Sequence, residues 1–304
     1  MVRFVLVLLV AGGCDFAFGI KKVSPPPAPC GPFLSVTEVP ITGVTEPRGF
    51  SISADEQLAL VTGKDSNGVT RPIPLHWNGS AWAPDPAMQG GLMSGMKGAN
   101  LAPSEPMPDT RNDYTGPVAP VMLLSSGQPL AVARYYLSNG TWTMDTNEQP
   151  FTEPSYDVLP GNVVLVAGSD PFDRVRHTVL TFVALDPTMD QNQIQIAANS
   201  PPSFTLLLKN RTDEVNSTGL GFGQSVMTED KSKLVFSAKS GAQYDLFASA
   251  QDDVRNFQAG GLIKSLDTDD DEVEPWIDAT CSKLYFRRVP AGQPNAAGQI
   301  YVAE

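Results

Sequence analysis

From about residue 33 to its end, the chain alternates between short apolar runs and clusters of polar turn residues. The last stretch shows this plainly, with apolar runs around Trp276-Ile277, over residues 283–288 and over Gln299–Ala303. Each run has the length of a strand, and none has the spacing of an amphipathic helix. Such short strands need partners that are close in the sequence. The pattern therefore predicts an antiparallel meander at the carboxyl end.

The same pattern of apolar run, polar turn and apolar run recurs along the chain. Further copies lie at residues 50–64, 118–134, 155–169 and 221–239. Recurrence of one supersecondary unit is the mark of a repeat architecture. We expect the following apolar residues to be equivalent near the start of each second strand: Leu58, Leu130, Val164, Leu234 and Leu284.

Two of the copies are followed by an Asn-Gly pair between apolar runs, Asn78-Gly79 and Asn139-Gly140. Asn-Gly favours a type I′ turn, in which both central residues have positive φ. The pairs therefore predict a tight hairpin between the third and fourth strands of their units. Large aromatic side chains fill interfaces between sheets, so we expect all four tryptophans to pack between units: Trp77, Trp82, Trp142 and Trp276.

The unit is thus a four-stranded antiparallel sheet that is repeated about five times. Radial repetition of such sheets gives a β-propeller, so the predicted fold is all-β, with a propeller over residues 33–304. Six blades is the alternative, because residues 86–116 or 187–215 could contain one more. Residues 33–41 have no strands of their own to join. Pairing them with Gln299–Ala303 would cover the open edge of the last sheet and close the ring.

Three copies also contain Glu-Pro, as Glu46-Pro47, Glu153-Pro154 and Glu274-Pro275. Together with turns such as Ser-Ala-Asp-Glu at residues 53–56, this series resembles the TolB-type propeller repeat. The glycine that ends the turn in that family is replaced in three units, and glycine stands in the corresponding turns of the other two. The replaced positions are Glu56, Lys231 and Cys281, and the retained ones are Gly127 and Gly161. The resemblance implies a propeller and an interaction module, but no binding residue matches closely enough to carry over.

The amino terminus has the pattern of a targeting segment over residues 1–19. Arg3 precedes a short apolar run, which is followed by Ala11-Gly12-Gly13-Cys14. Small residues before a cysteine resemble a bacterial lipobox, so we expect lipidation of Cys14. The alternative is ordinary signal cleavage after Gly19. Residues 20–32 are rich in proline and predict a tether. We therefore expect an exported protein that is lipid-anchored in the bacterial cell envelope, on a periplasmic or outer-membrane face.

Cys30 and Cys281 are the cysteines that remain. An exported chain reaches a compartment in which disulfides form, and closure of the ring would put both residues in one blade. We therefore expect a disulfide between Cys30 and Cys281. The alternative is a buried Cys281 that packs as a small apolar residue beside a free Cys30 in the tether.

Composition and motifs exclude several classes of site. The formal net charge is -12, and we find no basic cluster of the kind that nucleic acid requires. His76 and His177 are the only histidines, which argues against catalytic zinc, and no G-x-S-x-G motif occurs. The acidic run at residues 267–274 fails as an EF-hand because Glu272 stands where glycine is needed. A solvated turn is the preferred interpretation of this run, and calcium binding stays open. No catalytic, cofactor-binding or metal-binding residue is predicted.

Two functions remain from different classes. The first is a non-enzymatic, membrane-tethered propeller that binds an envelope protein or glycan. The alternative is a propeller-type hydrolase or lyase with acidic residues at the central channel. The alternative requires Asp, Glu, Arg or His side chains that converge at one site with shifted pKa values. The sequence alone favours the first.

Overall fold

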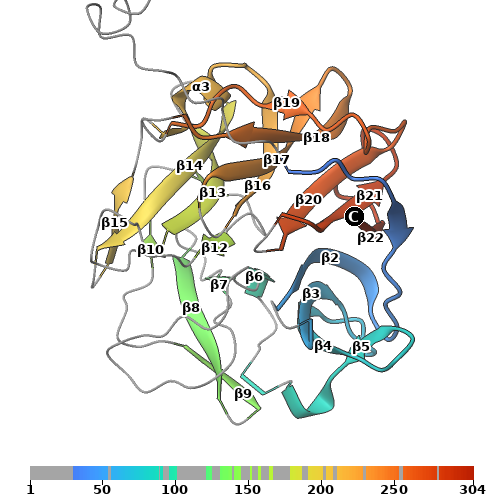
Figure 1. Cartoon of the computed structure of the whole chain (residues 1–304). Helices are drawn as coiled ribbons and strands as arrows, with labels where there is room; N and C mark the ends of the chain where they lie inside the picture. Colours follow the sequence, from blue (N-terminus) through green and yellow to red (C-terminus); the bar gives the residue numbers. More distant parts are fainter. Residues whose placement is uncertain are drawn as a thin grey trace, which may run out of the picture.

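The protein is a β-propeller, described here from a computed structural model in which the blades are antiparallel sheets. The structure describes residues 30–53, 56–88, 90–91, 96–100, 121–124, 131–138, 140–144, 151–152, 157–158, 164–166, 179–186, 191–200, 203–207, 211–228, 231–252, 256–278 and 281–304. Within these residues there are five sheets. Figure 1 shows them side by side around a common centre.

Three sheets consist of four strands in meander order. The first contains β2 (Thr45–Ile52), β3 (Leu58–Lys64), β4 (Thr70–Trp77) and β5 (Trp82–Pro84). The fourth contains β16 (Gly221–Met227), β17 (Lys233–Ser240), β18 (Gln243–Ala250) and β19 (Gly261–Leu262). The last contains β20 (Asp271–Ile277), β21 (Leu284–Val289), β22 (Gln299–Ala303) and β1 (Val36–Glu38).

The second and third sheets contain additional short strands. The second contains β6 (Met96–Asn100), β7 (Val121–Leu124), β8 (Ala131–Ser138), β9 (Thr141–Met144) and β10 (Phe151–Thr152). The third contains β11 (Asp157–Val158), β12 (Val164–Val166), β13 (Val179–Asp186), β14 (Gln191–Ser200) and β15 (Ser203–Leu207). Two short helical turns, η1 (Pro86–Met88) and α3 (Asp213–Asn216), lie in connections. The part of the chain that the structure describes contains no helix long and apolar enough to cross a membrane.

The predicted repeat is displaced by one strand in the second and third units. The phrase at residues 118–134 contains β7 and β8, yet β6 precedes β7 in the same sheet. In the phrase at residues 155–169, β11 and β12 both pair with β13, so they are two pieces of one edge. The equivalence assigned to Val164 is therefore wrong, and Leu130 lies outside the described residues. Apolar alternation marks a strand but does not say which strand of a sheet it is.

The last sheet lies between the fourth and the first, and its two faces form different cores. On one face Phe286 packs with Phe222 and Phe236 of the fourth sheet. On the other face Trp276 and Tyr285 pack with Phe50 of the first sheet, and the Phe50 and Tyr285 ring centroids are 5.2 Å apart. The leading strand β20 contacts both β16 and β2. Trp82, Trp142 and Trp276 are buried, whereas the packing prediction is wrong for Trp77, which is 44% exposed.

The amino-terminal segment pairs with the last strand, as the sequence predicts. β1 runs antiparallel to β22, with Val36 opposite Ala303 and Glu38 opposite Tyr301. The predicted disulfide between Cys30 and Cys281 is present, with a Cα–Cα distance of 5.4 Å. Both cysteines are buried. The bridge thus joins the start of the described chain to the turn between β20 and β21.

Three turns between first and second strands share one geometry. The side chains of Ser53, Thr228 and Asp278 accept a hydrogen bond from the backbone N–H five residues later. The residue three positions later has positive φ, with values of 55° at Glu56, 60° at Lys231 and 62° at Cys281. These are the positions where the TolB-type repeat has glycine. The shared turns make Ala59 equivalent to Leu234 and Leu284, since these residues pair with Ile52, Met227 and Ile277. The predicted equivalence of Leu58 is wrong by one residue.

The leading strands also share a bulge, and the Glu-Pro phrase does not mark it consistently. The register of β20 shifts between Val273 and Trp276, and that of β2 shifts between Arg48 and Ser51. The first bulged residue is Glu274 in one strand and Gly49 in the other, each with φ of 57°. Glu274 is therefore equivalent to Gly49 and not to Glu46.

The first predicted hairpin differs in detail from a type I′ turn. Trp77 pairs with Trp82, which leaves four residues in the loop. Gly79 has φ of 98°, but Asn78 is not among the residues with positive φ. The Asn78 side-chain oxygen instead accepts hydrogen bonds from the backbone N–H groups of Ser80 and Ala81. Asn78 thus closes the loop through its side chain and not through its backbone conformation.

Several sequence predictions fall outside the described residues. They are the targeting segment, the lipidated Cys14, most of the tether, Asn139, Glu153-Pro154 and His177. The described strands within residues 86–116 and 187–215 join the second and third sheets.

Candidate functional site

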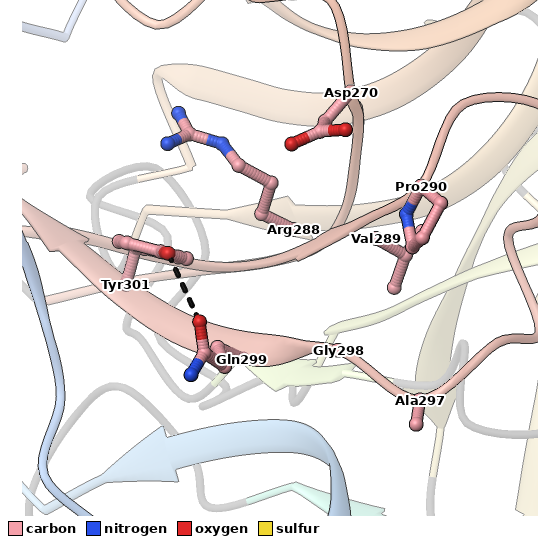
Figure 2. A pocket seen from close by; sticks show the side chains of 8 residues that line it. All are labelled: Asp270, Arg288, Val289, Pro290, Ala297, Gly298, Gln299 and Tyr301. Carbon is pink, nitrogen blue, oxygen red and sulfur yellow. Dashed lines mark hydrogen bonds between the residues drawn. The ribbon is translucent and has the colours of Figure 1, made fainter.

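A pocket of about 360 Å³ opens on the last sheet, beside the end of β21 (Figure 2). Its volume lies within the range of small-molecule sites, which is about 300–1,000 Å³. All of its lining residues come from the last sheet and its connections. They are Asp270, Arg288, Val289, Pro290, Ala297, Gly298, Gln299 and Tyr301.

Four polar side chains converge on this pocket, and cross-strand register brings three of them together. Arg288 lies opposite Gln299 in the β21–β22 ladder. The Arg288 guanidinium carbon is 4.7 Å from the centre of the Tyr301 ring, which is a cation–π distance. The Tyr301 hydroxyl donates to the Gln299 side-chain oxygen at 3.2 Å. Asp270, directly before β20, adds an exposed carboxylate (Figure 2).

Behind Arg288 lies a buried carboxyl group, that of Glu272. The Arg288 Nε donates to Glu272 Oε1 at 3.0 Å, and Thr268 Oγ1 donates to the same oxygen. Glu272 is 0% exposed, and its second oxygen, Oε2, has no hydrogen-bond partner. Burial raises the pKa of this carboxyl, the bonds from Thr268 and Arg288 oppose that shift, and the charge of Asp245 adds to it.

Two further carboxyl groups lie next to Glu272. Asp271 is fully buried; its Oδ1 accepts from the Tyr244 backbone N–H at 3.0 Å, and its Oδ2 has no partner. Asp245 comes from β18, and its pKa is raised by burial first and then by the charges of Asp267 and Asp271. The prediction of a solvated acidic turn therefore holds for the exposed Asp267, Asp269 and Asp270 and is wrong for Asp271 and Glu272.

The residues singled out in the sequence lie elsewhere. The Cys30–Cys281 bridge is at the opposite end of β21 from the pocket. His76 Nδ1 is 3.8 Å from Asp85 Oδ2 on the first sheet. Within the described ranges no group of three or more His, Cys, Asp or Glu side chains is placed to hold a metal ion.

The sequence analysis singled out Asp270 only as part of the acidic run and missed the other residues of the pocket. One pairing of opposite charges could not be read from the sequence. Without the bulge in β20, Glu272 would lie opposite Val289. With it, Glu272 lies opposite Arg288. Glu272 and Arg288 face each other only because the bulge inserts one extra residue into β20. No sequence pattern in this strand predicts that insertion.

Comparison with known proteins gives likeness of fold without likeness of sequence. No family model matches the chain, and no curated protein matches it. An endo-arabinase from Bacteroides thetaiotaomicron is similar with a TM-score of 0.52 and 12% identity, over 88% of this chain and 96% of that chain. An α-L-arabinofuranosidase from Fusarium graminearum has a TM-score of 0.50 and 9% identity, over 90% and 98%. A TolB from Acinetobacter baumannii has a TM-score of 0.45 and 10% identity, over 86% of this chain and 55% of that chain.

The likenesses to the arabinase and the arabinofuranosidase establish the propeller fold, which is the fold that the TolB-type repeat implies. They overturn the prediction of a non-enzymatic interaction module. The solved structures named above that match with TM-scores of 0.50 or more are glycoside hydrolases, so the enzyme alternative is the better supported one. The prediction failed because propellers with and without enzymatic activity share one strand pattern, and the active residues are not part of that pattern.

Proposed function

We propose that the protein is a propeller hydrolase that cleaves a glycosidic bond in the pocket beside Arg288. The observation that carries the proposal is the arrangement of Asp270, Arg288 and Glu272. An exposed carboxylate stands at the pocket, next to a guanidinium group that is bonded to a buried carboxyl group. Titratable groups of different environment that converge at a concave site are the usual basis of acid–base catalysis.

The pocket has the polar groups that a sugar requires. The Asp270 carboxylate can accept from sugar hydroxyl groups, and the Arg288 guanidinium can donate to them. Gln299, the cross-strand neighbour of Arg288, adds a side-chain amide to the lining. Among the described residues, the Arg288 guanidinium bonds Glu272 through Nε and lies over the rings of Phe286 and Tyr301. Its two terminal nitrogens can therefore bind a ligand oxygen.

Each group has a distinct role in the proposed hydrolysis. Asp270 takes a proton from the water that attacks the anomeric carbon, and the bond from that carbon to the glycosidic oxygen breaks. The terminal nitrogens of Arg288 stabilise the negative charge that develops on the departing oxygen, which then takes a proton from solvent. Glu272 does not touch the substrate, since it is 0% exposed. It is a positioning residue that orients Arg288.

The fold likeness supports this class of reaction by analogy only, because one fold carries many activities. The arabinase and the arabinofuranosidase are named for hydrolysis of arabinose-containing glycosides. We therefore take α-L-arabinofuranosides as the first substrates to test.

The test is hydrolysis of a panel of 4-nitrophenyl glycosides, with the α-L-arabinofuranoside first. Nitrophenolate leaves without a protonated acid, which suits a site whose pocket carboxylate is a base. We expect turnover by the native protein. Asp270→Asn should lower kcat/KM by about 10²–10⁴-fold, the usual contribution of a general base.

Asp269→Asn is the matched control, because Asp269 is an exposed neighbour that does not line the pocket. It should keep the native rate. Absence of turnover across the panel, or equal rates in the Asp269 and Asp270 variants, would overturn the proposed function.

A further inference from the structure

We propose that Glu274 is a positioning residue that ties one wall of the pocket to the first sheet of the ring. The wall is the connection between β21 and β22, residues 290–298, called here the pocket loop. Pro290, Ala297 and Gly298 of this loop line the pocket. The effect on substrate rests on the proposed function, whereas the effect on the loop does not.

The centre of the arrangement is a buried ion pair. Arg287 Nε donates to Glu274 Oε2 at 2.8 Å, and Arg287 Nη2 donates to Glu274 Oε1 at 2.8 Å. Two parallel hydrogen bonds of this kind fix the plane of the guanidinium relative to the plane of the carboxylate. The Arg287 side chain is 1% exposed and that of Glu274 is 10% exposed. Two further N–H groups of Arg287 donate to the pocket loop, at Ala296 O (2.7 Å) and Pro294 O (2.6 Å).

The Glu274 carboxylate also accepts a hydrogen bond from the first sheet. The Gly49 backbone N–H on β2 donates to Glu274 Oε2 at 2.8 Å. Beside it, the Arg48 guanidinium donates to Asn295 O of the pocket loop. Three consecutive carbonyl groups of the loop are therefore held by two arginines, one from the last sheet and one from the first. Glu274 bonds Arg287 of the last sheet and Gly49 of the first sheet, so it connects the two sheets that hold the loop.

The backbone at Glu274 also points to a role for its side chain. Its φ of 57° is the left-handed conformation that disfavours side chains, and the equivalent residue of β2 is Gly49. A residue with a Cβ atom is strained in this conformation, and glycine is not. Glycine would satisfy the backbone here, so the carboxylate is the reason for glutamate.

The loop has little room to settle elsewhere. A Cβ atom on Gly298 would lie 2.4 Å from the Arg288 carbonyl oxygen, so the loop packs directly on β21. Gln299 follows immediately and faces Arg288 across the ladder. Release of residues 294–296 would therefore move a pocket wall relative to Arg288. Substrate affinity should fall, whereas the step at Asp270 should change little.

The experiment compares Glu274→Gln with Glu46→Gln in the whole chain. Glu46 is a matched control: it has φ of 53°, precedes proline and forms an ion pair with Lys64, but it has no bond to the pocket loop. In Glu274→Gln we expect amide hydrogen exchange in residues 290–298 to be faster by about tenfold. KM should rise by about tenfold with kcat within about twofold. Glu46→Gln should change neither quantity.

Arg48→Gln is the second variant, because it removes only the link to Asn295 and keeps the buried pair. It should speed exchange in the same loop by a smaller factor. If loop exchange in Glu274→Gln equals that in Glu46→Gln, the proposal is wrong. If exchange rises and KM does not, the positioning role is wrong. The exchange measurement needs no substrate, so it decides the link even if the native protein hydrolyses no glycoside.

Discussion

At the scale of single residues, the least expected feature is the set of side chains in left-handed turns. Glu56, Lys231 and Cys281 occupy the glycine position of a repeated turn with φ of 55° to 62°. Left-handed backbone costs a residue with a Cβ about 1–2 kcal/mol relative to glycine. Cys281 has a compensating bond in the disulfide, and Glu56 pairs with Lys283. The strain is therefore retained where the side chain makes a distant contact.

Lys231 allows a direct test of that strain. We expect the free energy of unfolding of Lys231→Gly to exceed that of Lys231→Ala by about 0.5–1 kcal/mol, because relief of the left-handed conformation exceeds the added entropy of glycine in the unfolded chain. Both variants lose the contacts of the lysine side chain, so their difference reports the backbone strain. Urea denaturation measures the difference. A glycine variant no more stable than the alanine variant contradicts the account.

At the scale of elements, the junction of β18 with β20 concentrates buried carboxyl groups. Asp245 comes from β18, and Asp271 and Glu272 begin β20. Burial raises the pKa of both Asp245 and Glu272, so the folded junction binds protons more tightly than the unfolded chain does. By linkage, this contribution to stability is complete below the unfolded pKa values of about 4 and is lost as the pH rises through the folded values.

Removal of these protons should therefore appear as a pH-dependent difference between variants. We expect the stability of Asp245→Asn/Glu272→Gln, relative to the native protein, to increase as the pH rises from about 4 toward neutrality. The stability of the variant must be compared with that of the native protein at each pH, because Asp65 gives both proteins a pH dependence of the opposite direction. The backbone N–H of Val69, the largest effect, and Arg71 lower the Asp65 pKa. Urea denaturation at several pH values measures the difference. A difference that is constant with pH would show that the junction does not titrate.

At the scale of the whole molecule, the two ends of the described chain are joined twice. β1 completes the last sheet, and the disulfide joins Cys30 to Cys281 across a sequence separation of 251 residues. A cross-link over so long a loop removes much entropy from the unfolded chain, for which the chain-entropy model gives at most about 5 kcal/mol. The strand pairing therefore stabilises the folded protein, whereas the bridge destabilises the unfolded chain. Both favour the state in which the amino-terminal segment lies on the last sheet. Lipidation of Cys14 stays a prediction.

The bridge can be tested without disturbing the pocket. We expect Cys30→Ser/Cys281→Ser to lower the free energy of unfolding by about 2–5 kcal/mol. Native protein in reducing agent should unfold at the same urea concentration as the double variant, and the reductant should not affect the variant. Equal stability of the oxidised native protein and the double variant would show that the bridge contributes nothing.

The sequence by itself determined the strands, their antiparallel order at the carboxyl end, the pairing of residues 33–41 with Gln299–Ala303 and the Cys30–Cys281 bridge. These depend on alternation and turn chemistry, which are local. Only the tertiary structure decided the pocket. A bulge at Glu274 puts Glu272 opposite Arg288, and burial, with a smaller effect from Asp245 on β18, raises the pKa of the Glu272 carboxyl. Register and burial arise from residues distant in sequence, so the local pattern could not indicate the site.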